Sequence, residues 1–259
     1  MGVAGGPSIP QSGMQLNLDA SNSKSYPGSG TTWYDVSGND RDFTCASAPT
    51  FNAQPVVGGY RQPDSLDSVK FTGPASNSFG ITATSGVSFI FYLTNDAITN
   101  KSAFKWYAGD GSGTDARGYF SHLPWNNNYI YFDKITVTDG SLLNNGSTVT
   151  TAGGGRLHTN MSGGPGNPGS HINYFWVHVF TVSSDGATMK IYRDGELLIS
   201  RTNAGSNVTL SSDGATVGGD DSYASGWNAK MGSFLCYNRE LSATEVKQIT
   251  AALRGRDGA

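Results

Sequence analysis

The stretch from Trp176 to Ser200, WVHVFTVSSDGATMKIYRDGELLIS, constrains the fold more than any other part of the sequence. In its first seven residues, Val177, Val179 and Thr181 alternate with Trp176, His178, Phe180 and Val182, so the two sets point to opposite sides of a strand. Asp-Gly pairs at 185–186 and 194–195 separate this run from two further alternating runs. Asp-Gly between such runs favours a tight hairpin turn with positive φ at both central residues. We therefore predict a three-stranded antiparallel meander.

Composition extends this expectation to the whole chain. Thirty-five of the 259 residues are glycine, only 14% are charged, and long helical patterns are missing, which is typical of many short strands joined by polar turns. The net charge of −3 without a basic block argues against nucleic acid as a partner. No apolar run reaches membrane-spanning length, so no membrane contact is expected, and the first residues lack the basic segment and apolar core of a secretory signal.

The remaining pattern predicts a single β-sandwich domain over 14–259, preceded by an extended arm over 1–13. Alternation and turn signals predict strands at 14–20, 67–73, 85–95, 103–110, 118–123, 215–221 and 229–241, and either a strand pair or one long strand at 127–139. Residues 140–173 are too long for an ordinary loop and are either a functional excursion or irregular strands. One helix is expected over 242–253, because Ser242 and Glu245 form a capping box and Val246, Ile249 and Leu253 form an apolar stripe.

The two cysteines, Cys45 and Cys236, are too few for a disulfide framework. We expect Cys236 to be a buried thiol that packs as a small apolar side chain, with a Cys45–Cys236 bridge as the alternative.

Several segments stand in an order that resembles the laminin G-like, concanavalin A-like jelly-roll family. They are LNLDAS, TTWYDVSGND, SVKFTG, FWVHVFTVSSDGATMKIYRDGELL, TVGGDD and MGSFLCYNRELSATEV, and the match runs from about Leu16 to Leu253 while thinning out between 96 and 172. The resemblance implies an all-β fold of two packed antiparallel sheets with one short C-terminal helix. It also implies a role in binding glycans or proteins, sometimes with calcium.

The segment LDASNSKSYPGSGTTWYDVSGND is most similar to copies of this family in structural proteins of tailed phages. This resemblance implies a virion surface protein, either a capsid decoration or a fibre component, assembled in the host cytoplasm. Such a protein is expected to form a homo-oligomer, to dock on other virion proteins through its arm, and in some cases to bind host surface polysaccharide. The alternative is a carbohydrate-binding lectin module of a tail fibre or of a secreted, extracellular bacterial protein.

Catalytic patterns are missing from the sequence, so we expect no enzymatic activity. Glycoside hydrolysis usually needs two carboxylates on either side of the scissile bond. The only glutamates are Glu196 in a predicted turn, Glu240 at a strand end and Glu245 at a helix cap. The four histidines match no zinc-binding pattern, and His178 has the spacing of a packed strand histidine.

Two kinds of binding residue can be proposed from residue type. Hard cations prefer several oxygen ligands, which Asp35, Asn39, Asp40, Asp42, Asp220 and Asp221 offer; a calcium site and ordinary turn hydrogen bonding are both open interpretations. Sugars stack on aromatic faces beside polar groups, and the candidates are Trp106, Tyr107, Trp125, Asn127, Tyr129 and Tyr223, with core or subunit packing as the alternative.

The arm over 1–13 contains only Val3 and Ile9 as aliphatic residues larger than alanine. Because it has so little apolar area to bury, we expect a second subunit or another virion protein to order it. The alternative is that the arm packs back on its own domain.

Overall fold

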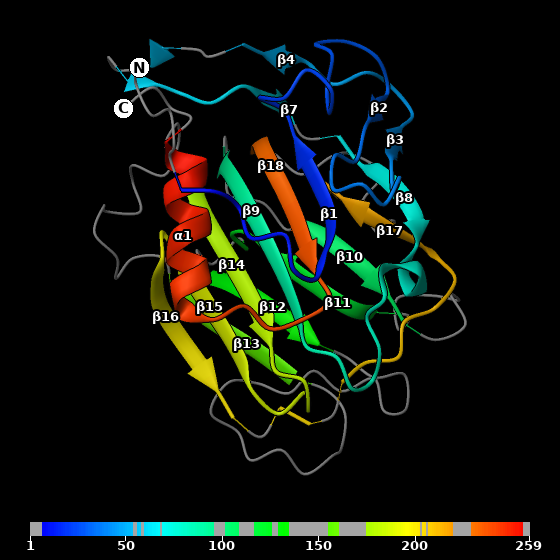
Figure 1. Cartoon of the computed structure of the whole chain (residues 1–259), viewed down its shortest axis with the longest axis vertical. Coiled ribbons are helices and arrows are strands. Elements are labelled where there is room, and N and C mark those ends of the chain that lie inside the picture. Colours follow the sequence, from blue (N-terminus) through cyan, green and yellow to red (C-terminus); the bar gives the residue numbers. More distant parts are fainter. Residues whose placement is uncertain are drawn as a thin grey trace.

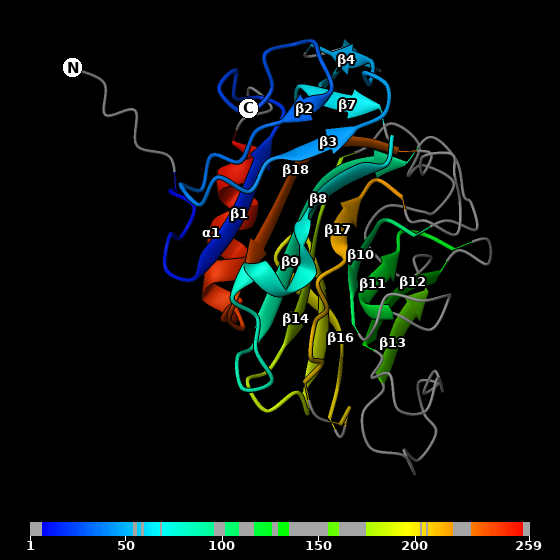
Figure 2. The ribbon, with the colours of Figure 1, turned by 90° about the vertical axis from the view of Figure 1, so that its right-hand side faces the viewer.

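A computed structural model describes residues 7–53, 56–57, 60–67, 69–95, 102–108, 117–125, 129–134, 155–160, 175–202, 204–205, 207–219 and 229–255. They form two packed antiparallel sheets with one helix on the outside, as predicted (Figures 1 and 2). Within this part of the chain, no helix is long and apolar enough to cross a membrane.

Sheet A has the strand order β16-β15-β14-β9-β18-β7-β4, and β1 also pairs with β18. Its strands are β1 (Met14–Asp19), β4 (Phe51–Asn52), β7 (Ser65–Asp67), β9 (Val87–Asn95), β14 (Trp176–Val182), β15 (Met189–Arg193), β16 (Glu196–Arg201) and β18 (Ala229–Tyr237).

Sheet B has the order β13-β12-β11-β10-β17-β8-β3-β2. Its strands are β2 (Thr32–Trp33), β3 (Phe43–Cys45), β8 (Phe71–Ala75), β10 (Phe104–Tyr107), β11 (Arg117–His122), β12 (Tyr129–Lys134), β13 (Gly155–Asn160) and β17 (Gly214–Val217). A separate pair joins β5 (Val56–Val57) to β6 (Tyr60–Arg61), and a 3-10 helix, η1 (Ser76–Phe79), follows β8.

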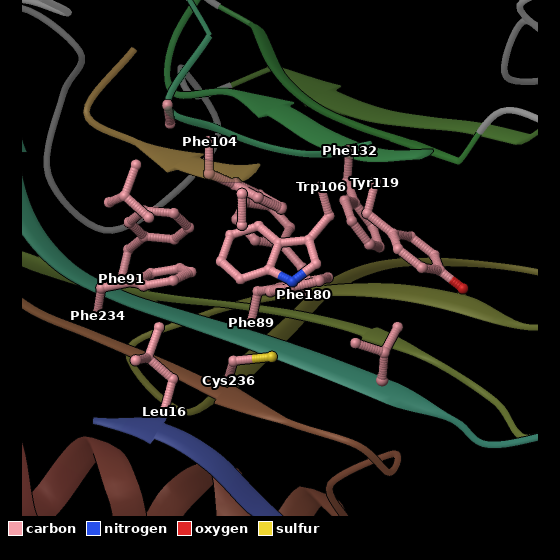
Figure 3. Packing of buried hydrophobic residues seen from close by; sticks show 14 of the residues in the cluster. Leu16, Phe89, Phe91, Phe104, Trp106, Tyr119, Phe132, Phe180, Phe234 and Cys236 are labelled. Carbon is pink, nitrogen blue, oxygen red and sulfur yellow. The ribbon is translucent and has the colours of Figure 1, made fainter. Parts of the chain in front are cut away.

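An aromatic core fills the space between the sheets. Trp106 of β10 lies at its centre, with ring centroids 5.1 Å from Phe79, 5.2 Å from Phe89 and 5.5 Å from Phe234 (Figure 3). Aromatic rings bury large apolar areas and pack best in such tilted arrangements, so this cluster supplies much of the attraction between the sheets.

A second apolar cluster lies on the other side of sheet A. The helix α1 (Ala243–Arg254) covers that face, and its predicted stripe of Val246, Ile249 and Leu253 is buried against Val177 and Val179, among others (Figure 1). Ser242 caps the helix, and both hydrogen bonds of the predicted capping box are present. Strand β14 is therefore buried on both faces, which explains why both of its alternating residue sets are mainly apolar.

The predicted meander is confirmed as β14, β15 and β16, but its two turns differ. Asp194 and Gly195 have φ of 50° and 84°, as the predicted tight turn requires. At the first turn only Gly186 has positive φ, and a longer connection is closed by the hydrogen bond from Ser183 N to Thr188 O at 2.9 Å. Asp185 accepts from the amide of Ala187, so its side chain fixes this turn locally.

The prediction of one strand over 67–73 is wrong. The chain leaves sheet A at Asp67 and enters sheet B at Phe71, so this segment crosses from one layer to the other. Leu66 and Phe71 are both fully buried in the core, and alternation along the chain cannot distinguish one strand from two that face the same core.

Both cysteines are free, and Cys236 is fully buried in the core, so the alternative of a Cys45–Cys236 bridge is wrong. Residues 140–173 were predicted to be a functional excursion or irregular strands. The structure describes β13 within this segment, at the edge of sheet B, and the rest of the segment lies outside the described residues.

The described part of the arm packs on its own domain. Gln248 donates to Ser8 O at 2.6 Å, Tyr237 to Pro10 O at 2.8 Å and Arg239 to Ser12 O at 2.7 Å. Ile9 also packs against the apolar cluster under α1. Residues 8–13 thus pack against β18 and α1 of the same chain, as the alternative for the arm describes, while residues 1–6 lie outside the described part.

Candidate functional site

Strands β10 to β13 carry an unusual set of side chains on the face of sheet B that points away from the core. Because side chains alternate along a strand, the core residues Trp106, Phe132 and Leu157 leave their neighbours on the opposite face. Strand register then aligns these neighbours in two rows across the sheet, His122–Tyr131–His158 and Phe120–Asp133–Arg156. We call this surface the outer face of β10–β13.

The first row is aromatic. His122 lies 4.3 Å from Trp125 and 6.0 Å from Tyr131, measured between ring centroids. His158 lies 5.2 Å from Tyr131 and 5.3 Å from Tyr129. Trp125, Tyr129, Tyr131 and His158 are all half-buried, so the row has solvent-accessible ring area held in place by neighbouring rings. The amide of Trp125 also donates to Tyr129 O at 2.9 Å, and this hydrogen bond holds together the two ends of the connection between β11 and β12.

The second row contains a buried ion pair. Arg156 donates two hydrogen bonds to Asp133, at 2.7 and 2.8 Å, and its guanidinium carbon lies 4.9 Å from the Tyr131 ring centroid. Burial alone lowers the pKa of Arg156, but the hydrogen bond and charge of the fully buried Asp133 outweigh burial and raise it. Bidentate pairs of this kind are strong and directional, so the pair fixes the donors and acceptors of this face.

The surroundings of His158 favour its neutral form. Burial and the neighbouring Arg156 charge lower its pKa, against a smaller opposing effect of Asp133. A neutral imidazole has one donor and one acceptor nitrogen, as hydroxyl-bearing ligands require.

The structure places the predicted sugar-stacking residues in different environments. Trp106 is fully buried in the core, so its prediction as a stacking residue is wrong (Figure 3). Tyr107 points to the outer face but is only 5% exposed, and Lys105 Nζ lies 4.2 Å from its ring centroid. Trp125 and Tyr129 come together in the aromatic row, whereas Asn127 and Tyr223 lie outside the described residues.

The described candidates for calcium ligands serve turns. Asp35 accepts hydrogen bonds from the amides of Asn17 and Arg41, and Asp42 accepts from the amide of Asp35. Asn39 donates to the backbone of Met14 and, like Asp40 with its φ of 56°, belongs to the same turn.

Across the described residues, no group of three or more acidic, cysteine or histidine side chains is placed to hold a metal. The structure therefore favours the turn interpretation for Asp35, Asn39, Asp40 and Asp42. Asp220 and Asp221 lie outside the described part.

Sequence reasoning missed most of the outer face, namely His122, Tyr131, Asp133, Arg156 and His158. Alternation places each residue on one face of its own strand. Their proximity depends on the pairing of β12 with β13, which joins residues more than twenty positions apart. The signal that pointed to this face was the spacing of two residues between Phe120 and His122 and between Tyr129 and Tyr131.

A protein-family model described as the concanavalin A-like lectin/glucanases superfamily matches residues 60–247. The chain belongs to this superfamily. Among curated proteins, no sequence matches the chain.

Solved structures of this concanavalin A-like fold are similar in shape but distant in sequence. Trypanosoma rangeli sialidase matches with a TM-score of 0.58 and 16% identity, over 95% of this chain and 34% of that one. The binding domain of botulinum neurotoxin serotype D matches with a TM-score of 0.61 and 16% identity, over 93% of this chain and 52% of the other. The binding domain of Paraclostridial mosquitocidal protein 1 has the same TM-score at 10% identity, over 93% and 52%. The chain thus spans between a third and about half of these solved chains, and the likeness concerns the fold.

The concanavalin A-like superfamily includes lectins and glucanases, so the surroundings of the glutamates bear on whether this chain could cleave a glycan. Glu196 lies 3.0 Å from Lys247, Glu240 lies 2.8 Å from Lys190, and Glu245 lies 2.6 Å from Arg239. Each glutamate is therefore in an ion pair, and none of these pairs lies on the outer face of β10–β13.

Proposed function

We propose that this chain is a non-enzymatic glycan-binding protein whose outer face of β10–β13 contacts the sugar. The half-buried rings of Trp125, Tyr131, His158 and Tyr129, arranged around the buried His122, are the observation that carries the proposal. Aromatic faces stack against the C–H groups of a pyranose ring, and neighbouring polar groups then select its hydroxyls.

Rigid placement of the polar groups supports this proposal. Asp133 and Arg156 hold each other in a bidentate pair, and a lowered pKa favours the neutral form of His158. Donors and acceptors therefore stand beside the rings and do not have to be ordered on binding. Ligand groups that meet a preorganised site lose less conformational entropy, which favours binding of flexible saccharides.

We propose that the chain is not catalytic because its carboxylates lack the surroundings that glycoside hydrolysis needs. A general acid in glycoside hydrolysis needs a raised pKa. The hydrogen bond from Arg239 instead lowers the pKa of Glu245 to about 2, with further contributions from Ser242. Asp133, on the proposed sugar face, is fully buried in its pair with Arg156.

Titration of the purified protein with ligands from a glycan array tests the proposal. Trp125→Ala and Tyr129→Ala should each weaken binding at least about tenfold, or about 1.4 kcal/mol. Tyr34→Ala is the matched control, because Tyr34 is an exposed aromatic at 44% that lies next to β2, at the opposite end of sheet B. Equal loss in all three variants, or no glycan bound by wild type, would contradict the proposal.

For the biological setting we propose a virion surface protein, with a capsid decoration or a fibre component as the two forms. The resemblance of the segment from Leu18 to Asp40 to structural proteins of tailed phages supports this setting. Under the same proposal the chain forms a homo-oligomer and contacts other virion proteins through its N-terminal arm. The alternative is a lectin module of a tail fibre or of a secreted bacterial protein. Immunogold labelling of virions from infected cells distinguishes a capsid from a fibre location, and virions without label would favour the secreted protein.

A further inference from the structure

Arg193 is a buried arginine whose guanidinium makes no hydrogen bond or ion pair with any described residue. Only 4% of the residue is exposed, and Nη1 is fully buried without a partner. Arg193 is the last residue of β15 and alternates with the core residue Ile191, so it points between the sheets. Its guanidinium carbon lies 4.7 Å from the ring centroid of Trp176, the first residue of β14.

The acidic residues next to Arg193 in the chain and opposite it in strand register are engaged elsewhere. Asp194 accepts from the amide of Val177 at 3.0 Å through Oδ1 and pairs with Arg254 at 2.7 Å through Oδ2. Glu196, the partner of Arg193 in strand register, is largely exposed and pairs with Lys247 at 3.0 Å. The register partner of Arg193 in β14 is His178, which carries no negative charge.

Such a residue lowers the stability of the protein in the absence of a ligand. An arginine keeps its charge, and burying a charge without a counter-ion is costly even when an aromatic face covers one side. Burial also lowers the pKa of Arg193, against the opposing effect of Asp194. Unfavourable polar environments of this kind are found at binding sites, where the ligand supplies the missing partner.

We propose that Arg193 and Trp176 form a binding site for an oxyanion, a carboxylate or a sulfate group, at the end of the sandwich where β14 begins and β15 ends. The planar guanidinium matches two oxygens of such a group with parallel hydrogen bonds. The indole of Trp176 holds the guanidinium plane in position. This site is separate from the outer face of β10–β13, because Arg193 belongs to sheet A and points into the space between the sheets, and it does not depend on the proposed glycan binding.

The test combines stability and binding in wild type and three variants. Arg193→Met keeps the length of the side chain and removes the charge, whereas Arg193→Lys keeps the charge and removes the planar donors. Arg41→Met is the matched control, because the Arg41 guanidinium donates to Gln15 O at 2.7 Å and to Ser78 O at 2.7 Å and is therefore satisfied within the protein.

Melting temperatures are measured at constant ionic strength in chloride, then with added sodium sulfate, sodium glucuronate or neutral glucose. Without oxyanion, Arg193→Met should melt at or above the wild-type temperature, while Arg41→Met should melt several degrees lower. Sulfate or glucuronate should raise the melting temperature of wild type and of Arg41→Met by several degrees more than that of Arg193→Met. The rise in Arg193→Met measures the general effect of the salt on stability, so the difference between the variants measures binding at the site. Arg193→Lys should lose most of this additional rise.

Calorimetric titration gives the source of the oxyanion. Tighter binding of glucuronate than of sulfate indicates an acidic sugar, and similar binding of both indicates oxyanions in general; both results support the site. Equal anion-dependent rises in wild type and Arg193→Met overturn the proposal. So does a large loss of stability in Arg193→Met together with no measurable binding of either anion to wild type, because Arg193 would then be a structural residue.

Discussion

At the residue scale, the burial of Lys134 makes the stability of the protein depend on pH. It is fully buried at the end of β12, and its ammonium donates to Gly186 O at 2.6 Å and Gly205 O at 3.1 Å. Burial lowers its pKa from 10.5 to about 7, against the effect of Asp185 and together with that of Arg201. Between these two values the unfolded chain binds more protons than the folded one, so this group makes the free energy of unfolding rise with pH.

We predict that Lys134→Met removes this dependence. Relative to the variant, wild type should gain stability by up to about 1.4 kcal/mol per pH unit from about pH 7 towards pH 10. Urea unfolding at a series of pH values measures the difference. Lys24→Met, at an exposed lysine, is the control and should run parallel to wild type. Parallel curves for Lys134→Met would contradict the assigned pKa.

Asn207 joins three loops through one buried amide. Its Nδ2 donates to Ser85 O and Ser184 O, both at 2.8 Å, and its Oδ1 accepts from Tyr119 Oη at 3.3 Å. Asn207→Ala leaves these buried groups unpaired, so the free energy of unfolding should fall by about 2–3 kcal/mol. Thermal and urea unfolding measure it. Asn22→Ala, which removes one local bond to the amide of Lys24, should cost less than about 1 kcal/mol.

At the element scale, the cap of α1 links the helix to the end of β18. Glu245 accepts from Ser242 N at 2.9 Å and pairs with Arg239 at 2.6 Å. The hydrogen bond from Arg239 holds the pKa of Glu245 at about 2, below its ordinary value of 4.5. A depressed carboxyl pKa contributes stability above the unfolded value, and this contribution is lost as pH falls from about 4.5 to about 2.

Glu245→Gln should therefore be less stable than wild type by about 1 kcal/mol at pH 7 and nearly equal to it near pH 2. Chemical denaturation at pH 7, 4 and 2.5 measures this convergence. Glu196→Gln is the control, because Glu196 is largely exposed in its pair with Lys247. A constant difference at all three pH values would show that the amide disturbs the cap by its shape and not by its charge.

The same scale shows how far the sequence determines the structure. The meander, the capped helix and its stripe follow from local rules, because hairpin turns and capping boxes involve neighbouring residues. The crossing between β7 and β8 does not, since both Leu66 and Phe71 face one core. Trp106 and Trp125 illustrate the limit for the site. Residue type made both of them candidates, but only the fold separates Trp106, on the core face of β10, from the half-buried Trp125 in the connection after β11.

At the scale of the whole molecule, the two layers have different surroundings. Within the described residues, sheet A is covered in its middle by the aromatic core on one side and by α1 on the other, whereas sheet B packs against the core on one side and carries the outer face of β10–β13 on the other (Figure 2). The helix and the described arm therefore protect one side of the sandwich, and the proposed sugar face lies on the opposite side.

Truncation of the arm distinguishes its structural part from its proposed docking part. Deletion of residues 2–13 removes Ile9 and the hydrogen bonds that Ser8, Pro10 and Ser12 accept, so the melting temperature should fall, by about 2 kcal/mol in free energy of unfolding. Deletion of residues 2–6 removes none of these contacts and should leave melting unchanged. Tyr237→Phe, which loses only the bond to Pro10 O, should cost about 1 kcal/mol.

Under the virion proposal, the shorter deletion should weaken oligomerisation, measured by sedimentation, or incorporation into virions. An unchanged melting temperature for the longer deletion would show that these contacts contribute nothing, and full assembly of the shorter deletion would refute docking through residues 2–6.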